Sequence, residues 1–178
     1  MSILKVARMG HPVLRRKARP LGPDEIRSPA FQQLIDDLFE TMAECQGIGL
    51  AAPQVHEGVR LFVAGYDEGE VQGVPRMALI NPEITVVDET VTEDWEGCLS
   101  IPDIRGRVPR PREIRVRALD RVGKRIEVQA RGYTARVIQH ETDHLDGILF
   151  FDRMTSFETL TYLDEFGRFW SDDDVTPE

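Results

Sequence analysis

The segment 139–147, QHETDHLDG, most constrains what this chain can fold into. It contains the pattern H-E-x-x-H, in which His140 and His144 stand four residues apart. On a helix, positions i and i+4 share a face, so these two histidines can both point at one ion. Glu141 would lie about 100° around that helix, close enough to handle a water beside the ion without binding the ion itself.

The surrounding residues predict that this helix lies in the core. Gly132 opens the run YTARVIQHETDHLD, and Gly147 stands where a left-handed C′ residue would end it. Apolar Tyr133, Val137 and Leu145 surround the histidines. A buried helix with two satisfied histidines and no metal is the alternative interpretation of this string alone.

An N-terminal amphipathic helix is expected from about Pro29 to Cys45. Ser28 is its expected N-cap, and Gly47 follows shortly after its end. Its apolar residues recur at helical spacing and form one face: Leu34, Ile35, Leu38, Phe39 and Met42. At the end of this helix, Cys45 is interpreted as a packing residue.

The middle of the chain is rich in β-branched residues. Segments 59–66 and 77–91 are typical of strands, and 114–130 predicts a hairpin around Gly123. The order helix, strands, helix favours an α+β fold with antiparallel pairing. We expect residues 1–170 to form a single domain and the acidic segment 171–178 to be a flexible tail.

Composition and charge exclude several classes of protein. A net charge of −9 argues against general nucleic-acid binding, although the segment from Arg105 to Arg117 could form a local basic patch. Two cysteines do not make a disulfide scaffold, and no stretch approaches the ~20 apolar residues of a membrane span. A basic N-terminus interrupted by Pro12 and Pro20 disfavours an organellar transit peptide. A bacterial cytoplasmic protein is therefore expected.

The third metal ligand decides the chemistry. In the pattern H-E-x-x-H-x-x-G-x-x-H it stands six residues after the second histidine, where this chain has Phe150. A later glutamate, Glu158 or Glu165, leaves too little chain for the helical subdomain of thermolysin-like enzymes. Neither of these routes supplies a convincing ligand.

Four soft side chains remain: His11, Cys45, His56 and Cys98. Cys98 lies in WEGCLSIP, at the end of a strand-like run, and a buried structural cysteine is the alternative interpretation. A Cys-His-His set with an open fourth position is typical of a catalytic site. A structural site in a binding module would instead need His11 or His56 as a fourth ligand.

Three segments, GIGLAAPQ (47–54), EGCLS (96–100) and QHETDHLDG (139–147), stand together in this order. This combination resembles the peptide deformylase family, whose members remove the formyl group from nascent N-formylmethionine. The resemblance runs from ILKVARMGHPVLRRKARPL near the start to ILFFDRM at 148–154. It implies an α+β fold with antiparallel sheets around a central metal-bearing helix. A small peptidase built on the same helix is the enzyme alternative.

The resemblance also implies roles for individual residues. Glu141 matches the general acid/base, while the Gln54 side chain and the Leu99 backbone N–H match the donors to the substrate carbonyl oxygen. The family's metal ligands match Cys98, His140 and His144.

Substrate binding is expected beside this centre. The resemblance implies that backbone groups of Ile48, Gly49 and Gly97 bind the peptide as an added strand. By their position on the helix, Tyr133, Val137 and Arg136 would line an apolar pocket for the methionine side chain. Arg105 falls where relatives carry an arginine near the site, and a solvated charge is its alternative role.

The implied cofactor is one divalent metal ion, Fe(II) in the cell, with Zn(II), Ni(II) or Co(II) as substitutes. The implied partners are N-formylmethionyl nascent peptides, and neither nucleic acid nor membrane is expected to bind. Proximity to the ribosome would not depend on a basic C-terminal helix, because the end TYLDEFGRFWSDDDVTPE is short, aromatic and acidic.

Two aromatic groups have no role assigned by this resemblance. Near the C-terminus, Phe166, Phe169 and Trp170 are expected to lie on the sheet or to mediate self-association. Asp94 and Trp95 fall near the mouth of the family's pocket, and their role is open.

Overall fold

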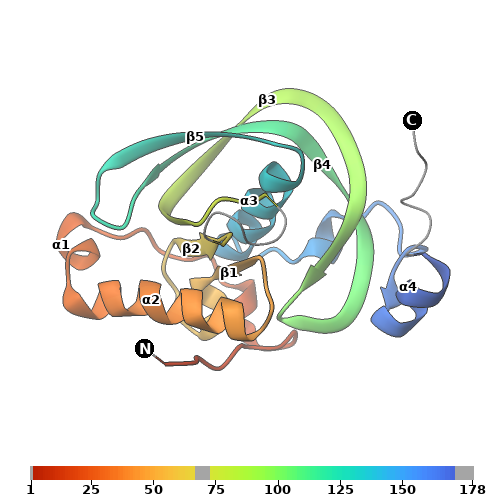
Figure 1. Cartoon of the computed structure of the whole chain (residues 1–178), viewed down its shortest axis with the longest axis horizontal. Coiled ribbons are helices and arrows are strands. Elements are labelled where there is room, and N and C mark those ends of the chain that lie inside the picture. The colour runs from red at the N-terminus through yellow and green to blue at the C-terminus, as the bar shows by residue number, and fades with distance from the viewer. Residues whose placement is uncertain (1, 67–72, 171–178) are drawn as a thin grey trace.

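The computed structural model describes residues 2–66 and 73–170. It confirms the α+β class. The sheet has the strand order β1-β2-β3-β4-β5, with β6 paired to β4, and every one of these pairings is antiparallel. Helix α3 lies in the middle of the molecule, enclosed by the arch of β3, β4 and β5 (Figure 1). The strands are β1 Gly49–Ala51, β2 Leu61–Ala64, β3 Met77–Cys98, β4 Ile101–Leu119, β5 Arg125–Arg131 and β6 Thr161–Tyr162. The α-helices are α1 Pro23–Ile26, α2 Pro29–Glu44, α3 Gly132–Leu145 and α4 Leu163–Phe169, with 3₁₀ turns at Pro12–Arg15, Ala52–Val55 and Phe150–Arg153.

Helix α2 matches the expected amphipathic helix. The Ser28 side chain accepts a hydrogen bond from the N–H of Phe31, as expected for an N-cap. The chain leaves the helix at Gln46, whose φ of 55° is left-handed. Cys45 is exposed, so its interpretation as a packing residue was wrong. The reason is that the helix has already ended and turned toward solvent at this residue.

Strand β2 lies between two helices. Leu61 and Val63 join the core cluster that contains the apolar face of α2. Phe62 and Ala64 join the cluster beneath α3. All four residues are fully buried, as expected for a strand covered on both faces.

Strands β3 and β4 form a long, curved ribbon. The expected strand 77–91 continues to Cys98, and its partner β4 begins at Ile101 instead of near Ile114. Register shifts between β3 and β4, from Ile80 onward to Cys98, bend the ribbon around α3. One continuous curved sheet therefore replaces the separate sheets that were expected.

Helix α3 is buried along nearly its whole length. Every residue from Ala135 to Leu145 is buried. Gly147 has φ of 74°, and a Cβ there would lie 2.7 Å from the carbonyl oxygen of Arg15. The predicted left-handed residue after the helix is thus confirmed, and the close approach of Arg15 favours glycine there.

The C-terminal part of the described chain forms β6 and α4, beside the β3–β4 ribbon (Figure 1). Phe166 and Trp170 pack on Trp95 of the sheet, whereas Phe169 is 69% exposed. Self-association through Phe169 stays a prediction. The expected tail 171–178 lies outside the described residues. None of the helices among the described residues is both long enough and apolar enough to cross a membrane.

Candidate active site

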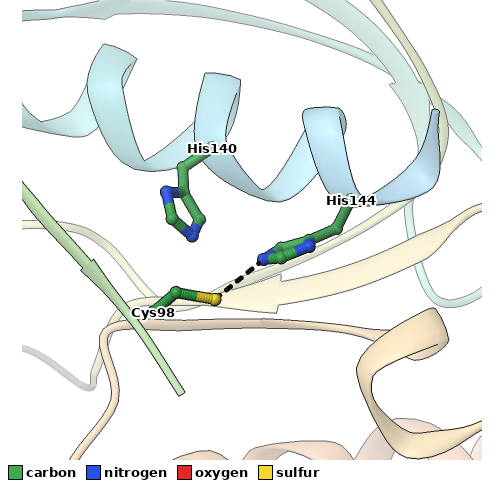
Figure 2. A group of neighbouring side chains, drawn as sticks. All are labelled: Cys98, His140 and His144. Carbon is green, nitrogen blue, oxygen red and sulfur yellow. Dashed lines mark hydrogen bonds between the residues drawn. The ribbon is translucent and has the colours of Figure 1, made fainter. Parts of the chain in front are cut away.

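The end of β3 and one face of α3 bring three metal-binding side chains together. Figure 2 shows the Cys98 thiol pointing at the imidazoles of His140 and His144, which come from the helix. Their candidate ligand atoms lie within 4.8 Å of one another, and Cys98 Sγ is 3.2 Å from His144 Nε2. Ligand atoms around a tetrahedral ion lie about 3.5 Å apart, so the donor set and its spacing fit a Zn(II)- or Fe(II)-type ion.

The charges at this site also suit a cation. Burial alone would raise the pKa of the Cys98 thiol, but the neighbouring His144 and His140 bring that pKa well below its ordinary value. The group is therefore prepared to be a thiolate, the form that binds metal. Among the described residues, no fourth His, Cys, Asp or Glu belongs to this group, which leaves an open position.

Glu96 orients one of the two histidines. Its carboxylate lies 2.9 Å from His140 Nδ1, and it accepts hydrogen bonds from Arg110 Nε at 2.9 Å and Arg136 Nη1 at 2.8 Å. With Nδ1 donating to Glu96, His140 presents Nε2 as its ligand atom. Burial would raise the pKa of Glu96, but hydrogen bonds from His140 and Arg110 hold it well below its ordinary value.

Sequence reasoning missed Glu96. A usable signal existed, since Glu96 stands two residues before Cys98 on one strand and so faces the same side of the sheet. The ion-pair network continues from Arg110 to Asp143, with Nη1 and Oδ2 2.6 Å apart, and from Asp143 to Arg153 at 2.7 Å. No local pattern in the sequence connects these three residues.

Glu141 lies beside the metal-binding group and is 4% exposed. Its Oε2 is buried and has no hydrogen-bond partner within the described residues. Burial raises the pKa of Glu141 to about 7. Strand β1 approaches this side chain so closely that a Cβ on Gly49 would lie 2.7 Å from Glu141 Cδ. Glu141 is therefore a confined carboxyl group poised to exchange a proton near neutral pH.

Gln54 is held with its amide N–H₂ toward the thiol. Its Oε1 accepts from the N–H of Ala51 at 2.8 Å, which fixes the orientation of the amide. Its Nε2 lies 3.6 Å from Cys98 Sγ and 3.2 Å from Ser100 Oγ. Ser100 was not identified from the sequence. Leu99, which follows Cys98, lines the same cavity.

A cavity of about 610 Å³ opens over this centre. The residues expected to bind substrate all line it: Ile48, Gly49, Gly97, Arg105, Tyr133 and Val137. Tyr133 is 42% exposed, whereas Val137 is buried. The Arg105 guanidinium covers Gly97, since a Cβ on that glycine would lie 2.8 Å from Arg105 Nε. Arg105 thus borders the cavity and is not a freely solvated charge.

Arg136 has a different role from the one expected. Its guanidinium donates to Glu96, to the carbonyl of Thr92 at 2.7 Å and to that of Val108 at 2.7 Å. These bonds tie α3 to β3 and β4. The side chain reaches the cavity wall, but its polar head is used for structure instead of an apolar pocket.

The histidines considered as a fourth ligand lie together elsewhere. The rings of His11 and His56 have centroids 4.7 Å apart, and His11 Nδ1 accepts from the N–H of Val13. Neither histidine belongs to the metal-binding group found among the described residues. The closed four-ligand site that a binding module would need is therefore not formed there.

Comparison with known proteins agrees with this site. The family model described as polypeptide deformylase matches residues 3–159. Peptide deformylase 1 of Bordetella pertussis is 43% identical over 161 residues, covering 88% of this chain and 90% of the relative. Peptide deformylase 2 of Nostoc sp. is 44% identical over 164 residues, covering 89% of this chain and 90% of the relative.

Solved structures show the same fold. A class I type b peptide deformylase from Acinetobacter baumannii, with Met-Ala-Ser bound, has a TM-score of 0.81 at 36% identity, covering 86% of this chain and 99% of that one. The peptide deformylase from Thermotoga maritima has a TM-score of 0.80 at 36% identity, covering 88% and 100%. The chain therefore belongs to the polypeptide deformylase family.

Proposed function

We propose that the residues around this cavity catalyse removal of the formyl group from N-terminal formylmethionine, with Cys98, His140 and His144 holding the metal ion. The chain is a metal-dependent hydrolase, a peptide deformylase that acts on nascent peptides. The observation that supports the assignment of residues is the position of Glu141. Its buried Oε2, which has no hydrogen-bond partner among the described residues, lies beside a three-ligand group to which no fourth described His, Cys, Asp or Glu belongs.

The protein's own groups account for the proton transfers. When bound, the metal supplies a Lewis acid and lowers the pKa of water beside it toward neutrality. Glu141 accepts the proton of the attacking water and returns it to the leaving amine. The amide of Gln54 and the backbone N–H of Leu99 donate to the oxygen that gains negative charge at the formyl group. A single donor of this kind typically stabilises the transition state by about 3 kcal/mol.

The proposed native metal is Fe(II), with Zn(II), Ni(II) or Co(II) as substitutes. The mixed donor set supports this range, because thiolate and imidazole ligands suit several divalent first-row metals. Oxidation of Fe(II) in air would favour replacement by the others. Metal analysis of protein purified without oxygen would decide which ion is native.

The backbone of β1 and the end of β3 would bind the peptide in an extended form. Gly49 and Gly97 line the cavity on these two strands, and Ile48 immediately precedes β1. Val137 and Tyr133 would contact the methionine side chain, with Arg105 beside the peptide backbone. The Met-Ala-Ser held by the Acinetobacter relative is a peptide of this kind. Equal turnover of formyl-norleucine and formyl-aspartate peptides would exclude an apolar pocket.

We further propose that residues 1–170 act as one catalytic unit in the bacterial cytoplasm, where formylated chains are made. The arginine-rich segment supports the absence of nucleic-acid binding. Arg110 is buried against Glu96 and Asp143, and both Arg115 and Arg117 pair with Glu127. Three of the six arginines between Arg105 and Arg117 are thus engaged in ion pairs within the protein. Any contact with the ribosome would use another surface.

Formate release tests the proposed function. Metal-loaded protein prepared without oxygen is mixed with formyl-Met-Ala-Ser or acetyl-Met-Ala-Ser. We expect formate and intact Met-Ala-Ser from the first peptide and little reaction with the second. Cleavage of an internal peptide bond would instead support a peptidase, and no reaction by folded, metal-loaded protein would reject the function.

A further inference from the structure

The C-terminal helix α4 contributes part of the wall of the active-site cavity. Leu163 and Phe166 of α4 line the same cavity as the metal-binding group, as does Trp95 of β3. The rings of Phe166 and Trp95 meet edge to face, with centroids 4.8 Å apart. We define Trp95, Leu163 and Phe166 as the outer wall. No step of the proposed chemistry uses these residues.

The sheet fixes where the outer wall lies. Gly97, Arg105 and Thr161 are partners across three neighbouring strands, β3, β4 and β6. Because α4 starts directly after β6, this register brings Leu163 to the cavity. The wall is therefore positioned by backbone pairing next to the glycine proposed to bind the peptide.

Trp95 is held firmly from the other side. The Arg107 guanidinium lies over its ring, 5.5 Å from the centroid, and the Arg107 N–H donates to Thr159 Oγ1 at 3.1 Å. Trp170 adds a second edge contact at 5.5 Å. A large aromatic surface is thus presented in a defined orientation at the cavity.

Distance along the strand indicates which substrate residue meets this wall. Trp95 precedes Cys98 by three residues, which corresponds to about 10 Å at the usual rise of about 3.3 Å per residue. An extended peptide advances by nearly the same rise. If its formyl carbon lies at the metal centre and its backbone follows Gly97, the third residue is level with Trp95.

We propose that the outer wall selects substrates by their third residue and favours apolar and aromatic side chains there over small polar ones. This inference rests on the proposed function, since it assumes a formyl-Met peptide in the cavity. Burying an aromatic side chain against such a wall removes apolar area from water, and a partly open site of this kind should give about a tenfold preference.

The test compares formyl-Met-Ala-Phe with formyl-Met-Ala-Ser by their kcat/KM ratio. We expect a ratio of about ten for the unmodified enzyme, falling to about one or two in Phe166→Ala. Phe166→Leu keeps an apolar side chain and should give an intermediate ratio. Phe169→Ala is the matched control, because Phe169 lies on the same helix, is 69% exposed and is not part of the cavity wall. Its ratio should equal that of the unmodified enzyme.

A binding measurement separates this inference from the proposed function. The only two tryptophans of the chain, Trp95 and Trp170, pack together at the wall, so their fluorescence reports binding of Met-Ala-Phe or Met-Ala-Ser. If the enzyme releases formate equally well from both formylated peptides, or if Phe166→Ala keeps the same preference, the role of the outer wall is rejected and the proposed function is retained. A second outcome is also informative: the enzyme releases no formate but binds Met-Ala-Phe more tightly than Met-Ala-Ser, and Phe166→Ala loses this difference in affinity. That outcome would reject the proposed function and support the outer wall.

Discussion

Glu141 is buried, and its Oε2 has no hydrogen-bond donor among the described residues, which is unusual for a carboxylate oxygen inside a protein. We predict that Glu141→Gln lowers kcat by about 10²- to 10⁴-fold, because the amide cannot accept the proton of the attacking water. Metal content, measured on the same sample, should be unchanged, since Glu141 is not among the ligands. The control is Glu158→Gln at an exposed position. Loss of metal together with activity would contradict the role as a base.

Glu96 contacts the proposed metal ligand His140 and is not itself a proposed ligand. We predict that Glu96→Gln weakens metal affinity by about 10- to 100-fold, because His140 loses the charged acceptor that fixes its ring. Competition with a chelator measures this affinity. Glu93→Gln, an exposed change on the same strand, should have no effect. Equal affinities in the two variants would show that Glu96 serves only the arginines.

At the scale of single residues, the sequence predicted the groups that meet in space wherever a short pattern carries them. His140, Glu141 and His144 share one helical turn, and the resemblance located Cys98 and Gln54. Glu96 was visible by strand alternation and was overlooked. Arg110 and Asp143 could not be found, because their contact joins residues 33 apart in the sequence.

Among the elements, the approach of β1 to α3 determines where the carboxylate of Glu141 can lie. We predict that Gly49→Ala lowers kcat by about 10²-fold with little loss of stability, because the new Cβ displaces the end of the Glu141 side chain and no backbone atom is among its closest contacts. Gly58→Ala is the matched control, since a Cβ there meets nothing within 4 Å. Thermal unfolding and kcat are measured for both. Full activity of Gly49→Ala would show that the carboxylate tolerates displacement.

Helices and strands were predictable from the sequence where the local preference of the residues agrees with the structure that they adopt in the folded sheet. Ser28 and Gly147 marked the limits of two helices correctly. The first half of β4 was missed, because Pro109, Pro111 and several arginines disfavour a strand locally. Its pairing with β3 overrides that preference, and this pairing is a property of the folded sheet. Helix α4 is short and was missed; its Phe166 packs on Trp95, a contact between segments far apart in the sequence that no local pattern predicts.

For the molecule as a whole, the metal ion would join the sheet to its central helix. We predict that removing the metal lowers the unfolding temperature by about 5 to 10 °C, given ~2.7 kcal/mol of stabilisation at free metal 100-fold above Kd. Differential scanning calorimetry with and without a chelator measures the change. Cys98→Ser should be much less sensitive to the chelator. An equal shift in that variant would mean that the metal binds elsewhere.

The overall shape was the least predictable property. The α+β class followed from the order of helices and strands. The bend of the β3–β4 ribbon depends on where register shifts occur, and Asn81 with φ of 51° lies at one of them. The cavity arises from that bend together with α4. Neither feature has a local signature in the sequence.

The separation of the metal ligands in the sequence has a consequence for synthesis. Cys98 and His144 are 46 residues apart, so the ribosome adds the second imidazole about 2 to 9 seconds after the thiol at ~5–20 residues per second. Until then Cys98 lacks at least one of the two histidines that would hold an ion with it. We therefore expect Cys98, His140 and His144 to hold a metal ion only after α3 has been made.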